Sequence, residues 1–212
     1  TYAFYDENTA GRLLDIQDLP PLPDTITTLF FGGISLVNDP AASAYAALQA
    51  REAATRVTMI DPNIRPSFIT DQAGYRLRMN AMLALADIVK ISDEDLHWLE
   101  GSGDLVTLAR GLLARGPKLV FLTEGASGAR AITPTQNRFI AGQKVTVADT
   151  VGAGDTFNAG ALAALAAAGA LSKTALAALP DATLDAALSL GNRAAAVTVS
   201  RAGATPPWAR EL

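Results

Sequence analysis

The stretch Asp149-Thr150-Val151-Gly152-Ala153-Gly154-Asp155-Thr156-Phe157 decides how this chain is organised. A predicted strand at residues 145–147 runs into it, and an Ala-rich predicted helix at residues 158–168 runs out of it. Glycines let the backbone turn tightly and approach a ligand closely. The free N–H groups at a helix start, together with the positive end of the helix dipole, favour a bound anion. The stretch is therefore predicted to form an anion-binding turn between a strand and a helix.

The anion-binding turn would consist of Gly152, Ala153 and Gly154, with the Asp155 carboxylate beside the anion. Since simple electrostatics would not place a carboxylate there, Asp155 suggests a base for a hydroxyl group that attacks a phosphate. The structural alternative is an acidic residue that complements the dipole in the first helical turn. A Rossmann fingerprint needs a third glycine at Phe157, and a Walker A loop needs Gly-Lys-Ser/Thr, so neither motif fits.

The composition is ordinary for a globular protein, because 50% of the 212 residues are hydrophobic and 18% are charged. This length suits a single domain that spans residues 1–212. The net charge of −4, without a basic cluster, argues against nucleic acid as a partner. The absence of cysteine excludes disulfides and thiolate chemistry, and the lone His97 excludes a histidine cluster.

A membrane partner is not expected either. The longest apolar run, residues 159–171, is shorter than the roughly 18 residues that a membrane span needs. The first residues lack the basic region of a secretory signal, which favours a cytoplasmic location.

Apolar runs alternate with helical patterns along the chain. Strands are predicted at residues 1–5, 27–31, 57–60, 88–91, 119–122, 130–133 and 138–140, and helices at 40–54, 71–86, 104–114 and 184–200, with a short helix from Ser92. This alternation predicts an α/β fold with a mostly parallel sheet and helices on both faces. Ligands bind at the carboxyl ends of such strands. The polar segments 32–33, 61–65, 92–95, 123–128 and 149–155 should therefore meet at one edge of the sheet.

Residues 149–157 closely resemble the second signature of the ribokinase-like (PfkB) carbohydrate kinase family, and the likeness runs from about residue 8 to residue 208. It implies a three-layer ribokinase-like fold and transfer of a phosphoryl group from ATP to a sugar hydroxyl. Asp155 would be the base, and the anion hole and Mg²⁺ would neutralise charge. Residues 4–10, 31–36 and 61–68 resemble the fructokinase branch, which implies fructose as the substrate and fructose 6-phosphate as the product. A 2-keto-3-deoxygluconate kinase and a non-catalytic sugar- or nucleotide-sensing module remain as alternatives.

The same resemblance implies a nucleotide site. The turn that contains Thr123, Gly125, Ser127 and Gly128 matches the family's Thr-x-Gly-x-x-Gly motif, which holds phosphate and ribose; the alternative is a plain glycine hairpin. The resemblance places Ser92 along the nucleotide and Asn192 beside the adenine. Ser92 and Asp95 stand where many relatives carry Asn-x-x-Glu, so Asp95 would act on Mg²⁺ indirectly. Ser-x-x-Asp also resembles a helix capping box.

The resemblance also implies sugar contacts and a cation site. Gly33, Asn63 and Arg65 would contact the sugar, and the Arg65 fork could bind phosphate charge; the alternative at residues 61–63 is a turn. A monovalent-cation site, which suits K⁺, would be formed by Asp149, Val151, Thr198, Arg201 and Gly203.

Family members carry a long segment before the position of Thr1. That segment holds the first strands of the sheet, most of the lid and most sugar contacts. The resemblance therefore implies that the N-terminal strands and most of the lid are missing here, and that residues 1–6 are the remnant of a lid strand. We expect nucleotide binding to survive better than sugar binding in this chain. A homodimer through the lid is a further partner that the family pattern allows.

Overall fold

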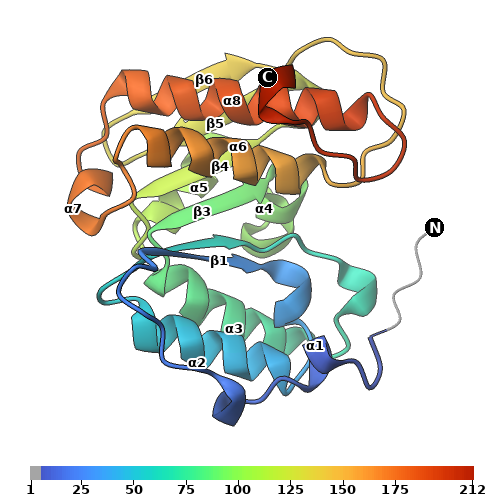
Figure 1. Cartoon of the computed structure of the whole chain (residues 1–212), viewed down its shortest axis with the longest axis vertical. Coiled ribbons are helices and arrows are strands. Elements are labelled where there is room, and N and C mark those ends of the chain that lie inside the picture. The colour runs from blue at the N-terminus through green and yellow to red at the C-terminus, as the bar shows by residue number, and fades with distance from the viewer. Residues whose placement is uncertain (1–5) are drawn as a thin grey trace.

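The computed structural model describes residues 6–212 and is built on one six-stranded sheet of order β1-β2-β3-β4-β5-β6 (Figure 1). The strands are β1 Thr28–Gly32, β2 Val57–Asp61, β3 Ile88–Ser92, β4 Leu119–Thr123, β5 Gly128–Ile132 and β6 Asn137–Ala141. The strands β1 to β4 pair in parallel, and β5 and β6 are added antiparallel. The prediction of a mostly parallel sheet is confirmed.

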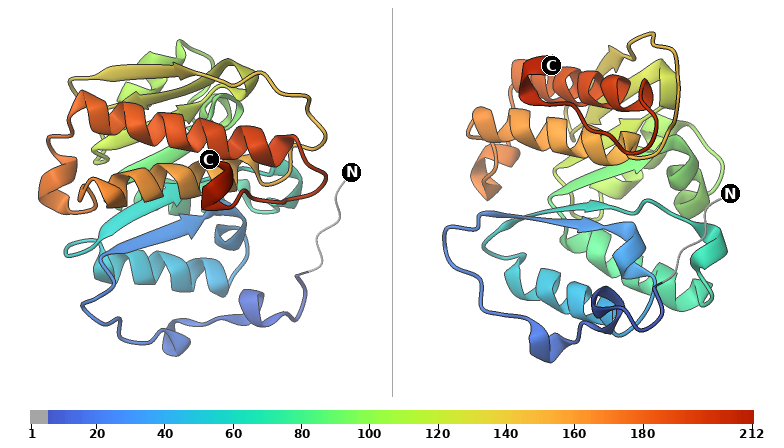
Figure 2. Two further views of the ribbon diagram at one scale, coloured as in Figure 1. Left: turned by 45° about the horizontal axis from the view of Figure 1, so that its top comes forward. Right: turned by 45° about the vertical axis from the view of Figure 1, so that its right-hand side comes forward.

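Helices cover both faces of the sheet. They are α1 Ala10–Leu13, α2 Ala41–Glu52, α3 Gln72–Leu85, α4 Asp93–Glu100, α5 Leu105–Leu113, α6 Ala153–Ala167, α7 Lys173–Leu176 and α8 Asp181–Val199. One apolar core lies between the sheet and α2 to α5, and a second lies between the sheet and α6 to α8. Figures 1 and 2 show α6 and α8 side by side on one face of the sheet. Because both faces are covered, every residue of β2 is buried.

Alternation along the strands distributes the side chains between the two cores. Ile60 of β2 and Val89 of β3 are register partners and face the α2–α5 core. Met59 and Ile88 are the preceding pair, and they face the core beneath α6 and α8. Asp61 follows Ile60 and Lys90 follows Val89, so alternation places both side chains on the α6–α8 side as well.

The backbones of α6 and α8 approach each other closely. A Cβ atom on Gly160 would lie 2.9 Å from the Cα atom of Gly191, and one on Gly191 would lie 2.8 Å from the Phe157 ring. Phe157 in turn packs edge-on against Phe121 of β4. Two glycines thus allow α6 and α8 to pack closely against each other on the same face of the sheet.

Several predicted boundaries need correction. Residues 145–147 were predicted as a strand, but they pair with no strand of the described sheet, and Val147 is 59% exposed. The helix expected from residue 158 begins already at Ala153, because Gly152 adopts the left-handed conformation that ends the preceding turn. The last helix begins at Asp181, after Pro180, and not at residue 184. The strand predicted at residues 1–5 lies outside the described residues.

Among residues 6–212, none of the helices combines the length and the apolar character required to cross a membrane.

Candidate active site

The polar strand ends meet along one edge of the sheet, as predicted. In the parallel register Gly32 is paired with Asp61, and Ser92 is paired with Thr123. The start of α6 reaches the same edge, because a Cβ atom on Gly154 would lie only 3.0 Å from the Nζ atom of Lys90. Residues 149–155 thus join the other polar segments through α6, although the described residues 142–148 that lead into them form no strand.

The start of α6 has the features of an anion hole. Gly152 has a φ of 79°, and the helix begins at the next residue. Within the described part of the chain, the backbone N–H groups of Gly154 and Asp155 have no hydrogen-bond acceptor, whereas that of Ala153 makes a long bond of 3.4 Å to the Thr150 carbonyl. Free N–H groups at the positive end of a helix dipole bind anions.

The side chain of Asp155 is available for chemistry. The residue is exposed, and its carboxylate makes no hydrogen bond or ion pair with any other residue between positions 6 and 212. A carboxylate without a fixed partner at an anion-binding helix start can accept a proton from a bound hydroxyl group. The geometry therefore allows Asp155 to act as the base that the sequence predicts.

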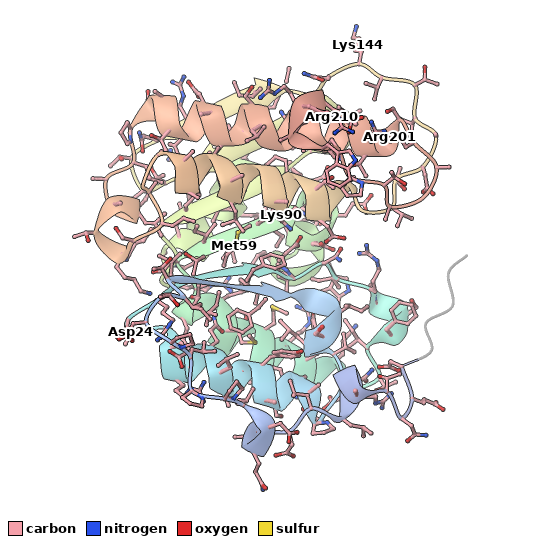
Figure 3. All side chains as sticks on the ribbon, viewed as in Figure 1. Asp24, Met59, Lys90, Lys144, Arg201 and Arg210 are labelled. Atoms are coloured by element: carbon pink, nitrogen blue, oxygen red, sulfur yellow. The ribbon has the colours of Figure 1, made fainter. Side chains whose placement is uncertain are left out.

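A buried ionic network lies directly beneath the start of α6. The Lys90 ammonium group donates to Asp61 Oδ2 over 3.1 Å, and the Asn158 amide of α6 donates to the same oxygen over 2.8 Å. The three residues are 4%, 2% and 3% exposed, respectively. Figure 3 labels Lys90 and Met59 in the layer between α6 and the sheet.

Sequence reasoning assigned no role to Lys90, Asp61 or Asn158. One signal was present, because Lys90 is the only charged residue in the otherwise apolar run Ile88-Val89-Lys90-Ile91. A charged side chain in a strand that is covered on both faces requires a buried partner. The identity of the partner could not be read from the sequence, since Asp61 and Asn158 lie far away along the chain.

Ser92 and Asp95 connect α4 to the loop after β2. The Ser92 hydroxyl accepts the Asp95 N–H over 3.0 Å and caps α4, as predicted. The Asp95 carboxylate does not complete a capping box, because its Oδ1 atom accepts the N–H of Ile64 instead. Burial raises the pKa of Asp95 above its ordinary value, and the negative charge of Asp61 adds to this effect. Asp95 is therefore a buried link between two loops and fits Mg²⁺ only as an indirect contact.

The three predicted sugar contacts lie at the ends of β1 and β2. Gly33 is buried, and a Cβ atom there would lie 1.6 Å from the Pro62 carbonyl oxygen. Asn63 has a positive φ of 39°, and its N–H bonds to the Asp61 carboxylate, so residues 61–63 do form a turn. Arg65 is exposed and donates to the neighbouring Ile64 carbonyl, which leaves the rest of its fork at the surface.

The predicted nucleotide turn lies between β4 and β5. Gly125 and Gly128 have φ values of 53° and 130°, so side chains there would be strained. The Ser127 carbonyl accepts the N–H of Gly142, which joins the turn to the end of β6. The turn is thus the glycine hairpin of the alternative interpretation, and the phosphate role remains a prediction.

Asn192 of α8 is 8% exposed and donates to the carbonyl oxygen of Ile140 over 2.9 Å. It ties α8 to β6. The predicted contact of Asn192 with adenine is untested.

The predicted cation residues gather around the Asp149 carboxylate. One of its oxygens accepts the Val151 N–H over 3.1 Å, and the other accepts the Gly203 N–H over 3.0 Å. These backbone donors lower the pKa of Asp149 below its ordinary value. The Thr198 hydroxyl donates to the Ala194 carbonyl and the Arg201 side chain is itself a cation, so the ligands expected from these two residues are backbone carbonyls. Carbonyl and carboxylate oxygens suit a hard cation, and the donor set fits K⁺.

Comparison with known proteins identifies the family. The model of the pfkB family carbohydrate kinases matches residues 6–210, so the chain belongs to this family. The resemblance noted in the signature at residues 149–157 is thereby confirmed.

Curated relatives include two bacterial fructokinases. The fructokinase of Rhizobium leguminosarum bv. trifolii is 50% identical over 184 residues, which cover 87% of this chain and 56% of that protein. The fructokinase of Klebsiella pneumoniae is 37% identical over 80% of this chain and 55% of its own length. The chain thus spans about half the length of these relatives.

Solved structures agree on the fold. One is a double mutant of fructokinase from Vibrio cholerae O395 in its fructose, ADP and potassium ion bound form. It superposes with a TM-score of 0.81 at 27% identity, and the match covers 93% of this chain and 61% of the fructokinase chain. Aminoimidazole riboside kinase from Salmonella enterica, complexed with its riboside and an ATP analog, superposes with a TM-score of 0.75 at 28% identity. It covers 90% of this chain and 61% of its own. The ribokinase-like fold is therefore shown.

Proposed function

We propose that this chain forms the nucleotide-binding and catalytic part of an ATP-dependent fructokinase, which converts fructose to fructose 6-phosphate. The observation that carries the proposal is the start of α6, where the free N–H groups of Gly154 and Asp155 lie beside an unpartnered carboxylate. Membership of a carbohydrate kinase family and the names of the relatives support the choice of substrate.

In this proposal each element of the sheet edge has one task. The backbone at Gly152, Ala153 and Gly154 holds the γ-phosphate, and Asp155 takes the proton of the sugar hydroxyl as the phosphoryl group moves. Phosphoryl transfer depends on positioning and charge neutralisation more than on covalent chemistry. The remaining predicted ligands extend the site, with nucleotide at Ser92, Thr123, Gly125, Ser127, Gly128 and Asn192, and sugar at Gly33, Asn63 and Arg65.

Two cations complete the proposal. Mg²⁺ bound with the nucleotide would neutralise phosphate charge, and the buried Asp95 would influence it only indirectly. A monovalent cation, K⁺ by the chemistry of its ligands, would bind at Asp149 and order the loop that leads into the anion hole. The fold would act as one kinase core over residues 1–212, with any dimer formed through the lid.

The test is a coupled ADP-release assay with a panel of acceptors that contains fructose, 2-keto-3-deoxygluconate and aminoimidazole riboside. We expect fructose to give the highest kcat/KM in the complete protein. ADP release with another member of the panel and none with fructose would replace the substrate but keep the enzyme class. ATP binding without ADP release for any acceptor would favour a sensing module.

A further inference from the structure

Lys90 has unused hydrogen-bonding capacity. A lysine ammonium group carries three N–H donors. Only one acceptor, Asp61 Oδ2, lies within hydrogen-bond distance among residues 6–212. Buried polar groups are nearly always satisfied, so a buried ammonium group with spare donors calls for a further partner.

The spare donors lie next to the anion hole. The Nζ atom is 3.0 Å from the position that a Cβ atom on Gly154 would occupy, so the ammonium group lies directly against the Gly154 backbone. Gly154 is also one of the residues whose N–H group is free. The ammonium group and the free N–H groups are therefore separated by one glycine backbone.

Stability does not account for this arrangement. A buried ion pair is costly to desolvate, and apolar residues of similar volume often replace such a pair without loss of stability. The network is also incomplete, because the Oδ1 atom of Asn158 is buried and has no partner in the described structure. A partly satisfied charged network directly below an anion site indicates a functional role.

We propose that Lys90 is a further catalytic residue, whose ammonium group donates past Gly154 to the phosphoryl oxygens of the nucleotide, while Asp61 and Asn158 position it. The inference rests on the proposed function. During transfer the bond from the γ-phosphorus to the bridging oxygen of ADP breaks and the bond to the sugar oxygen forms. The Asp155 carboxylate takes the hydroxyl proton. Lys90 keeps its proton throughout and stabilises the negative charge on the phosphoryl oxygens.

The decisive variant removes the ammonium group without leaving an unpaired buried charge. Lys90→Met alone would strand the Asp61 carboxylate and could prevent folding. The double variant Lys90→Met/Asp61→Asn is neutral at both positions, and the amide oxygen that replaces the carboxylate can still accept from Asn158. A matched control is the pair Lys173 and Asp87, in which Nζ lies 2.6 Å from a carboxylate oxygen but belongs to α7. The control double variant is Lys173→Met/Asp87→Asn.

Calorimetric titration with ATP, ADP and AMP in the presence of Mg²⁺ gives the test on this chain. Charged hydrogen bonds predict that the Lys90→Met/Asp61→Asn variant loses about tenfold to hundredfold in ATP affinity. AMP affinity should stay unchanged, and thermal unfolding should show a folded protein. The control variant should bind all three nucleotides as the wild type does.

Two results would overturn the inference. If the double variant keeps the wild-type preference for ATP over AMP, Lys90 is only the counter-charge of Asp61, and the proposed function stands. If the wild type binds none of the three nucleotides, the proposed function fails, and the role of Lys90 fails with it.

Discussion

The carbonyl oxygen of Pro62 lies 1.6 Å from the point that a Cβ atom on Gly33 would occupy. The segments that follow β1 and β2 are thus packed backbone against backbone at the edge of the sheet that carries the site. This contact gives Gly33 a structural reason to be glycine that is independent of its predicted sugar contact.

Gly33→Ala should therefore destabilise the protein. The contact atom is the main-chain carbonyl oxygen of Pro62, which cannot rotate away as a side chain could. Overpacking of this kind destabilises a protein by about 1–3 kcal/mol. Gly111→Ala is the matched control, since a Cβ atom there meets nothing within 4 Å inside α5, and it should stabilise by up to about 1 kcal/mol. Urea denaturation measures both effects. Equal shifts for the two variants would contradict the close contact.

Asp155→Asn should lower kcat by about 10²–10⁴-fold, because the variant keeps the shape of the side chain but loses the base. ATP affinity should change little, since the ground-state contacts come from backbone N–H groups. The coupled ADP-release assay gives kcat, and calorimetry gives the affinity. Asp24→Asn, at an exposed position on a distant loop, is the control and should leave both values unchanged (Figure 3). A loss of kcat smaller than about tenfold would point to another base.

Asp95→Asn should stabilise the protein at neutral pH. The pKa of Asp95 is raised in the folded state above its ordinary value of 3.8, so its favourable contribution is complete below that value and is lost as the pH rises through the folded pKa. The asparagine oxygen can still accept the Ile64 N–H, and no charge is buried. The gain should appear in urea denaturation at about pH 8 and vanish at about pH 3.5. A loss of stability at both pH values would mean that the carboxylate charge is needed.

Asp149→Ala should weaken the loop before α6 in a manner that depends on pH. Its pKa is lowered by the N–H groups of Val151 and Gly203, so its stabilising contribution is present above the unfolded pKa and is lost as the pH falls through the folded value. The difference in unfolding free energy between wild type and variant, measured by urea denaturation, should therefore shrink in acid.

The same residue tests the proposed cation. Replacement of Na⁺ by K⁺ should raise the turnover of the wild type and leave Asp149→Ala unaffected. Equal rates in the two salts, for both proteins, would remove the cation from the proposal.

Local sequence patterns were sufficient to predict the sheet and most of its strands. An apolar run such as residues 88–91 is sufficient to predict a buried strand, and the structure has a buried strand there. Residues 145–147 alternate between apolar and polar side chains, as a strand does, but they pair with no strand of the described sheet. Strand pairing is a tertiary property that a local pattern does not contain. The start of α6 was placed too late because Gly154, which lies in its first turn, has a low helix propensity that tertiary context overrides.

The candidate site was predicted as far as its signature reaches along the chain. The positions of Asp155, Ser92 and Thr123 at this edge could be predicted, because each residue belongs to a local motif. The network beneath them was not predicted, because Asn158 contacts a carboxylate 97 positions away. Such a contact depends on which strands are neighbours and on the register between them.

The glycine contact between α6 and α8 limits which parts of the molecule can move. Gly160 and Gly191 pack backbone against backbone, so any relative shift of the two helices would disturb this contact. The anion hole is attached to this closely packed helix pair, whereas Gly33, Asn63 and Arg65 lie just beyond the ends of β1 and β2. Hydrogen exchange should therefore be slower in α6 than in the segments that follow β1 and β2.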